Sequence, residues 1–412
     1  MNQLFKNIII ALSGNAFNAI INMFLIFYIS RVYGLDFYGE FVIYQTTIMI
    51  AYVVTKINVW QSFVHKYYFF KNNSHVIKMH FGFDSFFSII SLVISFPIVA
   101  IIYDPVLALI SSLYIVFYSN GFIVGLWRAK NKFNYYAIAL NVCALLKLFV
   151  VFLIFFESAH EFVMFFFLCD ILVWLSIWCG ELILNKKNIF SKPLYYILLF
   201  NRALKNGKEV RFIFGCYLSS LIDLPVSQLD KLILALFVSP YYVGVYSLIR
   251  KVCQLISTVT EPVTHVLYSE YNKLLMLGRI KKVTLISKIF SFSIIFIGGI
   301  LLLFVNGTFN YFNDEFLKNQ LYEQKGLLLL GLAIQVIGLS FSWLNPLVLA
   351  IGAVKKSNYI ALIANILYLG TLYFGTMFFG INAAFFALLL QYFIVAYLKY
   401  MVFYSYRKGL LI

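Results

Sequence analysis

Apolar segments long enough to cross a lipid bilayer follow one another along almost the whole chain. A transmembrane helix needs about 20 mostly apolar residues, because the hydrocarbon core is about 30 Å thick and a helix rises about 1.5 Å per residue. The sequence predicts twelve such helices, over residues 8–30, 41–64, 81–103, 105–126, 135–156, 161–184, 212–238, 243–268, 284–305, 326–351, 358–379 and 381–404.

The overall composition excludes a soluble globular protein. Hydrophobic residues make up 63% of the chain and charged residues only 12%, whereas soluble domains carry about 25% charged residues. The net charge of +16 often indicates a nucleic-acid partner. No basic soluble domain is present here, so we expect the lipid bilayer and no nucleic acid as partner. The five cysteines lie in apolar segments without a CxxC pair, so neither a metal site nor a disulfide framework is predicted.

Basic residues alternate between loops in a way that predicts the orientation of the chain. Every second loop is basic, and the loops between are short and mostly acidic. Because basic loops stay in the cytoplasm, both termini are expected there. The longest basic loop divides the chain into two sets of six spans. We therefore predict an N-terminal lobe over residues 1–190, an amphipathic cytoplasmic linker over 191–211 and a C-terminal lobe over 212–412.

Charged residues inside the predicted spans indicate more than a membrane anchor. A charge at the centre of a transmembrane helix costs about 2.5–3.5 kcal/mol on insertion scales, and such residues normally face a polar cavity or a partner. Among the charged residues within the predicted helices are Lys56, Lys147, Asp170, Asp223, Asp230, Lys231, Arg250, Lys251 and Glu261. An anchor would gain nothing from them, so the pattern favours a polar pathway and hence a transporter.

The seventh and eighth spans form a hairpin around Pro240. Asp230 and Arg250 each lie about ten residues from this turn, or about 15 Å deep, which predicts an ion pair between them. The pair could have a purely structural role in holding the two helices together. Alternatively, Asp230 could hold Arg250 in place while Arg250, Lys231 or Lys251 contacts an anionic substrate. Asp223 is one further candidate for gating or ion coupling. Pro225 removes a backbone hydrogen bond and is a candidate hinge.

Two other pairs of charges follow from the spacing. The stretches "YGEFVI" (Tyr38–Ile43) and "VGVYSL" (Val243–Leu248) form a faint internal repeat. Aligning its glycines places Lys56 opposite Glu261, which we interpret as an inner gate, although two separately solvated charges are the alternative. Lys147 and Asp170 lie at middle depth on adjacent spans, so they either pair with each other or leave Lys147 to face an anionic substrate.

Several stretches of the chain resemble polysaccharide flippases of the Wzx type, in the MOP exporter superfamily. The similar stretches are "LDKLILALFVSPYYVGVYSLIRKV", "SRVYGLDFYGEFVIYQ", "NPLVLAIGAVKKSNYIALIANILYL" and "GINAAFFALLLQY". The resemblance implies an all-α protein with about 12 transmembrane helices in two MATE-like lobes around a cavity that alternates between membrane faces.

The resemblance also implies a cargo, a membrane and an energy source. The cargo would be an oligosaccharide repeat unit linked by pyrophosphate to undecaprenol, flipped across the bacterial inner membrane for O-antigen or capsule synthesis. The cavity cations Lys56, Lys147, Lys231, Arg250 and Lys251 would suit the pyrophosphate. A proton or sodium gradient would drive transport through Asp170, Asp223, Asp230 or Glu261, with no bound cofactor. A polysaccharide polymerase and a chain-length regulator would be partner proteins.

Two other functions remain open. One is an ion-coupled multidrug exporter of the same superfamily, whose cation-exporting cavity should be acidic. The other is a membrane-embedded O-antigen polymerase, an enzyme that typically has a large basic outer loop. The predicted cavity has more cations than carboxylates, and no outer loop exceeds about twenty residues. We therefore expect a transporter and not an enzyme.

Overall fold

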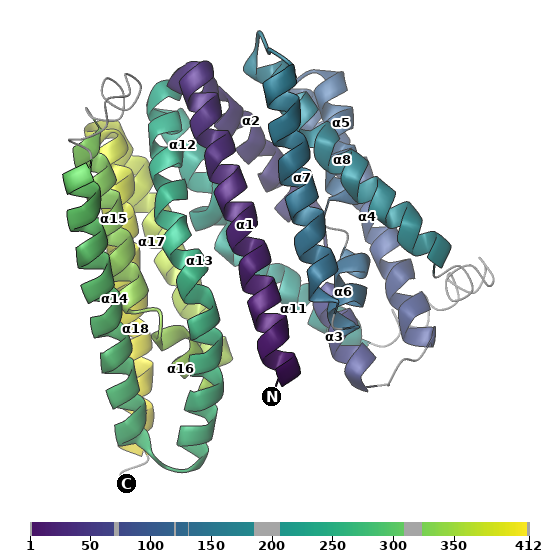
Figure 1. Cartoon of the computed structure of the whole chain (residues 1–412). Helices are drawn as coiled ribbons and strands as arrows, with labels where there is room; N and C mark the ends of the chain where they lie inside the picture. The colour runs from purple at the N-terminus through teal and green to yellow at the C-terminus, as the bar shows by residue number, and fades with distance from the viewer. Residues whose placement is uncertain are drawn as a thin grey trace. The chain divides into compact units, whose positions relative to one another are not determined.

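The computed structural model describes residues 2–69, 74–118, 121–130, 132–184, 207–308 and 324–409, and their regular secondary structure is entirely helical (Figure 1). The helices of the first half are α1 (Asn2–Val32), α2 (Gly34–Thr55), α3 (Trp60–Phe69), α4 (Ser74–Ile102), α5 (Pro105–Phe117), α6 (Gly121–Ala129), α7 (Phe133–Leu153) and α8 (Ala159–Leu184). The later segments are α11 (Gly207–Leu224), the π-helical turn η1 (Pro225–Leu229), α12 (Asp230–Ala235), α13 (Pro240–Met276), α14 (Ile280–Thr308), α15 (Lys325–Ser340), α16 (Leu344–Ala350), α17 (Val354–Phe379) and α18 (Ile381–Gly409).

The predicted all-helical membrane fold is confirmed. Within the described residues, nine helical segments are long and apolar enough to cross a bilayer, and α1 contributes a shorter apolar helix over Ala16–Val32. The other two predicted spans, residues 212–238 and 243–268, fall on α11–η1–α12 and on α13. These are the segments with the densest intramembrane charges, so they are helical without being uniformly apolar.

Four of the predicted spans are interrupted in the structure. The chain is non-helical at residues 56–59 between α2 and α3, and α5 ends at Phe117 before α6 begins at Gly121. The segment Pro225–Leu229 is π-helical, and turn residues 341–343 separate α15 from α16. The sequence predicts continuous spans here because hydropathy is averaged over a whole segment, and such an average does not register a local break of the backbone.

The chain divides into two compact units. The first consists of residues 1–25 and 44–224, and the second of residues 26–43 and 225–412. The corner between α1 and α2 therefore packs with the second half of the sequence. Most of the predicted amphipathic linker, residues 191–206, lies outside the described residues.

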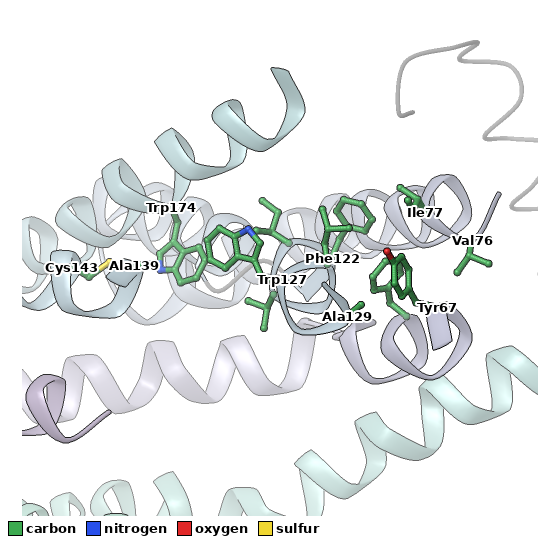
Figure 2. Close-up of a cluster of buried hydrophobic side chains, with 13 residues drawn as sticks. Tyr67, Val76, Ile77, Phe122, Trp127, Ala129, Ala139, Cys143 and Trp174 are labelled. Atoms are coloured by element: carbon green, nitrogen blue, oxygen red, sulfur yellow. The ribbon is translucent and has the colours of Figure 1, made fainter. Parts of the chain in front are cut away.

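In the first unit, aromatic side chains hold α3, α6 and α8 together. Figure 2 shows this buried cluster, in which the rings of Trp127 and Trp174 lie 6.3 Å apart. The indole N–H of Trp127 donates a hydrogen bond to Glu181 at 2.7 Å. Gly125 lets α6 approach α3 closely, since a Cβ there would lie 3.0 Å from the ring of Phe63. This packing fixes the start of α3, and with it the break that follows α2.

In the second unit, the two copies of the sequence repeat pack against each other. A Cβ on Gly39 would lie 1.8 Å from the carbonyl oxygen of Pro240, and one on Gly244 would lie 2.5 Å from that of Leu35. Only glycine permits such an approach of two backbones. The repeated glycines therefore serve a helix–helix contact that brings the start of α2 onto the start of α13.

We expect Gly39→Ala to lower the melting temperature of the purified protein in detergent. The added methyl group must displace the Pro240 carbonyl, and overpacking of this kind costs typically about 1–3 kcal/mol. Gly299→Ala is the matched control, because nothing lies within 4 Å of a Cβ built there in α14. Alanine should stabilise that helix by about 0.5–1 kcal/mol. Equal melting temperatures for the two variants would contradict the close contact.

Candidate functional site

The densest group of intramembrane charges lies in the second unit, where α12 and α13 meet. The carboxylate of Asp230 is fully buried and accepts a hydrogen bond of 2.8 Å from the hydroxyl of Tyr246. The Nε atom of Arg250 lies 4.0 Å from the same carboxylate oxygen. The hairpin of α12 and α13 thus brings together residues at equal distance from its turn, and the predicted ion pair is confirmed.

The π-helical turn before Asp230 explains two further contacts of the cations. A wider turn leaves backbone carbonyls without regular α-helical partners. The guanidinium of Arg250 lies 3.4 Å from the carbonyl oxygen of Val226, and the ammonium of Lys231 lies 3.3 Å from that of Ser227. Lys231 also donates to the side chain of Gln228 at 3.2 Å. Both cations are therefore engaged by the protein itself.

Lys251 differs from its neighbours. Its side chain is exposed, and the structure gives it no hydrogen bond or ion pair to any described residue. We define the cation cluster as Asp230, Lys231, Arg250 and Lys251. The cluster contains one carboxylate and three cations, so two positive charges are not compensated within it. Such an arrangement favours an anionic group at Lys251.

Tyrosines complete this site, and the charge pattern alone does not reveal them. Tyr246 belongs to the repeat motif, and Tyr368 of α17 is buried close enough to Asp230 and Arg250 to interact electrostatically with both. Further along, the hydroxyl of Tyr392 donates to Gln335 at 3.2 Å, and Gln335 donates to Ser257 at 2.6 Å. Hydrogen-bonded polar groups, of which Gln335 is buried and Ser257 and Tyr392 are half-buried, thus extend from α13 to α15 and α18.

In the first unit, Lys147 and Asp170 form a second buried ion pair. Their charged atoms are 2.6 Å apart, and the side chains are 10% and 2% exposed. The ammonium of Lys147 also lies 3.7 Å from the ring centre of Phe166. Of the two alternatives left open by the sequence, the structure has the pairing of Lys147 with Asp170, and the role of the pair in transport stays a prediction.

Lys56 is buried at the break between α2 and α3. It donates hydrogen bonds to the hydroxyl of Ser88 and, at 3.2 Å, to the carbonyl oxygen of Val116 at the end of α5. The buried carboxylate of Asp84 is near enough to interact with it electrostatically. Asp84 is a charge within a predicted span that the sequence analysis missed. The side chain of Glu261 lies outside the described residues, so the proposed gate between Lys56 and Glu261 stays a prediction.

The remaining predicted site residues lie where the chain leaves the first unit. Asp223 is exposed near the end of α11, and Pro225 is the first residue of the π-helical turn. The boundary between the two compact units falls between Leu224 and Pro225. The predicted hinge is therefore at a junction of the chain, and its motion stays a prediction. Among the described residues, no group of three or more His, Cys, Asp or Glu side chains could hold a metal ion.

The whole chain superimposes on transporters of known structure. A single-site mutant of the Vibrio cholerae MATE transporter VcmN matches with a TM-score of 0.56 and 13% sequence identity, over 99% of this chain and 97% of that one. The chain has the fold of the MATE transporters. The outward-facing form of a multidrug resistance MATE family transporter of the MOP superfamily matches with a TM-score of 0.54 and 13% identity, over 98% and 94% of the two chains. The inward-facing form of such a transporter matches with a TM-score of 0.53 and 14% sequence identity, over 99% of this chain and 90% of that one.

These similarities concern the fold alone, because the identities are low. No family model matches the chain, and no curated protein is significantly similar to it. Together with its apolar helices, the fold identifies the chain as a multi-pass membrane protein. It does not assign a cargo.

We expect the Lys147–Asp170 pair to behave as a buried pair in unfolding experiments. Asp170→Leu should lower the free energy of unfolding by about 3–5 kcal/mol, because it leaves a buried ammonium without its counter-ion. The double variant Lys147→Met, Asp170→Leu should recover most of this loss, since apolar replacements of buried pairs are often neutral.

Thermal and denaturant unfolding in detergent would measure both effects. If the double variant is as unstable as the single one, the pair is not coupled as described. Transport by a stable double variant would mean that the pair has only a structural role. Loss of transport would mean that its charges take part in the transport cycle.

Proposed function

We propose that this chain is a flippase for undecaprenyl-pyrophosphate-linked oligosaccharide repeat units, located in the bacterial inner membrane. It would move the polar head group from the cytoplasmic to the outer face by alternating access, for the synthesis of O-antigen or capsule. The observation that carries the proposal is the excess of cations around Lys251 on a transporter fold. A pyrophosphate needs cationic or N–H donors to replace its hydration.

The position of the cluster supports this proposal. Lys251 lies about 15 Å from the turn at Pro240 by helical rise, so it is at the depth of the bilayer centre. An exposed lysine at that depth is costly against lipid and is expected to face water. The polyprenyl chain of the cargo would remain in the hydrocarbon core, because only the head group needs a polar path.

The energy source and the partners are part of the same proposal. Transport would be coupled to a proton or sodium gradient, for which Asp170, Asp223, Asp230 and Glu261 are the candidates. Asp170 and Asp230 have cationic neighbours and are buried, and Asp223 is exposed. A polysaccharide polymerase and a chain-length regulator would act on the product at the outer face.

A multidrug exporter is the second candidate, and the fold supports it equally well. Two of the similar structures are of multidrug resistance transporters. An exporter of cationic drugs should present carboxylates to its cargo, whereas the group accessible in the described cluster is an ammonium. The charge of the cluster therefore favours an anionic cargo.

Deletion of the gene in its host should abolish surface polysaccharide and trap lipid-linked repeat units at the cytoplasmic face. Immunoblotting of surface polysaccharide and glycan analysis of lipid extracts would measure the two effects. New drug sensitivity with normal polysaccharide would instead indicate the multidrug exporter. Unjoined repeat units at the outer face would indicate a polymerase.

Complementation with Lys251→Gln should restore much less polysaccharide than the native gene does. Lys273→Gln is the matched control, because Lys273 is also an exposed lysine on α13 but lies near the end of that helix. Loss of one charge–phosphate contact of about 1.5–3 kcal/mol should weaken cargo binding by roughly one to two orders of magnitude. Equal complementation by the two variants, at equal protein levels, would contradict the role of Lys251.

A further inference from the structure

A small cavity lies in the first unit, at the break between α2 and α3. Its volume is about 120 Å³, and its walls include Tyr52, Lys56, Asn58, Trp60, Cys216 and Tyr217. An engineered protein cavity of about 150 Å³ accommodates benzene. The space is therefore somewhat smaller than that cavity and admits at most one small ring.

The break in the helix supplies polar groups to this cavity. An ammonium has three N–H donors, and Ser88 and Val116 accept two of those of Lys56. The side-chain oxygen of Asn58 is buried and has no hydrogen-bond partner among the described residues. Its amide nitrogen donates to the hydroxyl of Tyr52 at 3.3 Å. The cavity thus offers a donor and an acceptor that the described residues leave unused.

The aromatic walls of the cavity are held in place. The guanidinium of Arg128 lies 4.0 Å from the ring centre of Trp60, and the rings of Tyr52 and Tyr118 meet edge to face at 6.1 Å. Rigid aromatic rings beside a few fixed polar groups are typical of sites for small polar molecules. Because Asp84 offsets the charge of Lys56, the lining suits a neutral, hydroxyl-bearing ring better than a phosphate.

Helix α11 forms the remaining wall. The hydroxyl of Tyr217 donates a hydrogen bond to the carbonyl oxygen of Val54, one residue before the end of α2. Much of α11 around it is exposed, including Phe214 and Leu218. The same helix leads directly into Pro225 and the π-helical turn. A ligand in the cavity would therefore contact the segment that precedes the cation cluster in the chain.

We propose that this cavity is a saccharide subsite, which binds one sugar ring of the cargo. The proposal rests on the proposed function. The ring would lie against Trp60 and Tyr52, with its hydroxyl groups bonded to Lys56 and Asn58. Tyr217 would hold α11 over the occupied site.

Cys216 provides a native probe of occupancy, because it lines the cavity. In a variant that keeps only this cysteine, we expect alkylation by N-ethylmaleimide to be several-fold slower in membranes that contain the lipid-linked saccharide of the host. The reference is membranes from a strain that cannot attach the first sugar to the lipid. The matched control keeps only Cys179, which is exposed on α8, and its alkylation rate should be the same in both membranes.

Three outcomes would overturn the proposal. Equal rates for Cys216 in the two membranes, whether fast or slow, would mean that no sugar enters the cavity. Equal protection by added undecaprenyl phosphate without sugar would mean that the site binds the lipid carrier. Equal slowing of the alkylation of Cys179 would mean that the membranes change the accessibility of cysteines in general.

The site and the function fail separately. Surface polysaccharide measured in the same cells reports whether the Cys216-only protein transports its cargo. Normal surface polysaccharide without protection of Cys216 would reject the subsite and would not contradict the flippase function. Polysaccharide that does not depend on this gene would reject the flippase. As a further check, Tyr217→Phe should raise the alkylation rate in sugar-free membranes, because it removes the hydrogen bond to Val54.

Discussion

Backbone carbonyls released where a helix breaks are the groups on which the rest of this structure depends. In an apolar environment each unsatisfied backbone group costs several kcal/mol, so an interrupted transmembrane helix needs other donors. Lys56 donates to Val116 at the end of α5, and Tyr217 donates to Val54 near the end of α2. Arg250 and Lys231 do the same for the carbonyls of the π-helical turn. Cations inside the helices therefore allow the backbone to depart from regular helix.

This requirement changes how the intramembrane charges are interpreted. A lysine in a transmembrane helix suggests a role in substrate binding, yet most of the cations here contact carbonyls or carboxylates of the protein itself. Lys147 pairs with Asp170, and Arg250 is near Asp230. Lys251 stands apart among the described cations of the cluster, and for that reason it is the one to which we assign the phosphate. A net positive charge counted from sequence does not measure the positive charge available to a ligand.

The sequence predicts the helical segments and the Asp230–Arg250 pair, and it offers the Lys147–Asp170 pair as one of two alternatives, because span length and depth depend on local rules. Hydropathy gives the length of each span, and equal distance from a tight turn gives equal depth for Asp230 and Arg250. The breaks, the contact of Gly39 with Pro240 and the hydrogen bond of Tyr246 depend instead on which helices become neighbours. Asp84 and Lys399 are buried charges that the sequence analysis passed over, since each lies near the end of a predicted span and not at its centre. The cavity near Trp60 could not be predicted, because its walls come from helices far apart in the chain.

The π-helical turn at Pro225–Leu229 has a consequence for the tolerance of this segment to insertions and deletions. A π-helical turn can be regarded as α-helix into which one extra residue has been accommodated. Deletion of a single residue there would let the segment relax to regular α-helix, and the side chains beyond it would keep their direction, because the wide turn already takes up the extra residue. Asp230 would still point toward Tyr246 and Arg250, but the carbonyl groups of Val226 and Ser227, which now accept from Arg250 and Lys231, would return to regular helical hydrogen bonds. The number of residues in this turn, and not only their chemistry, therefore determines which backbone carbonyls the cations of the cluster can bind.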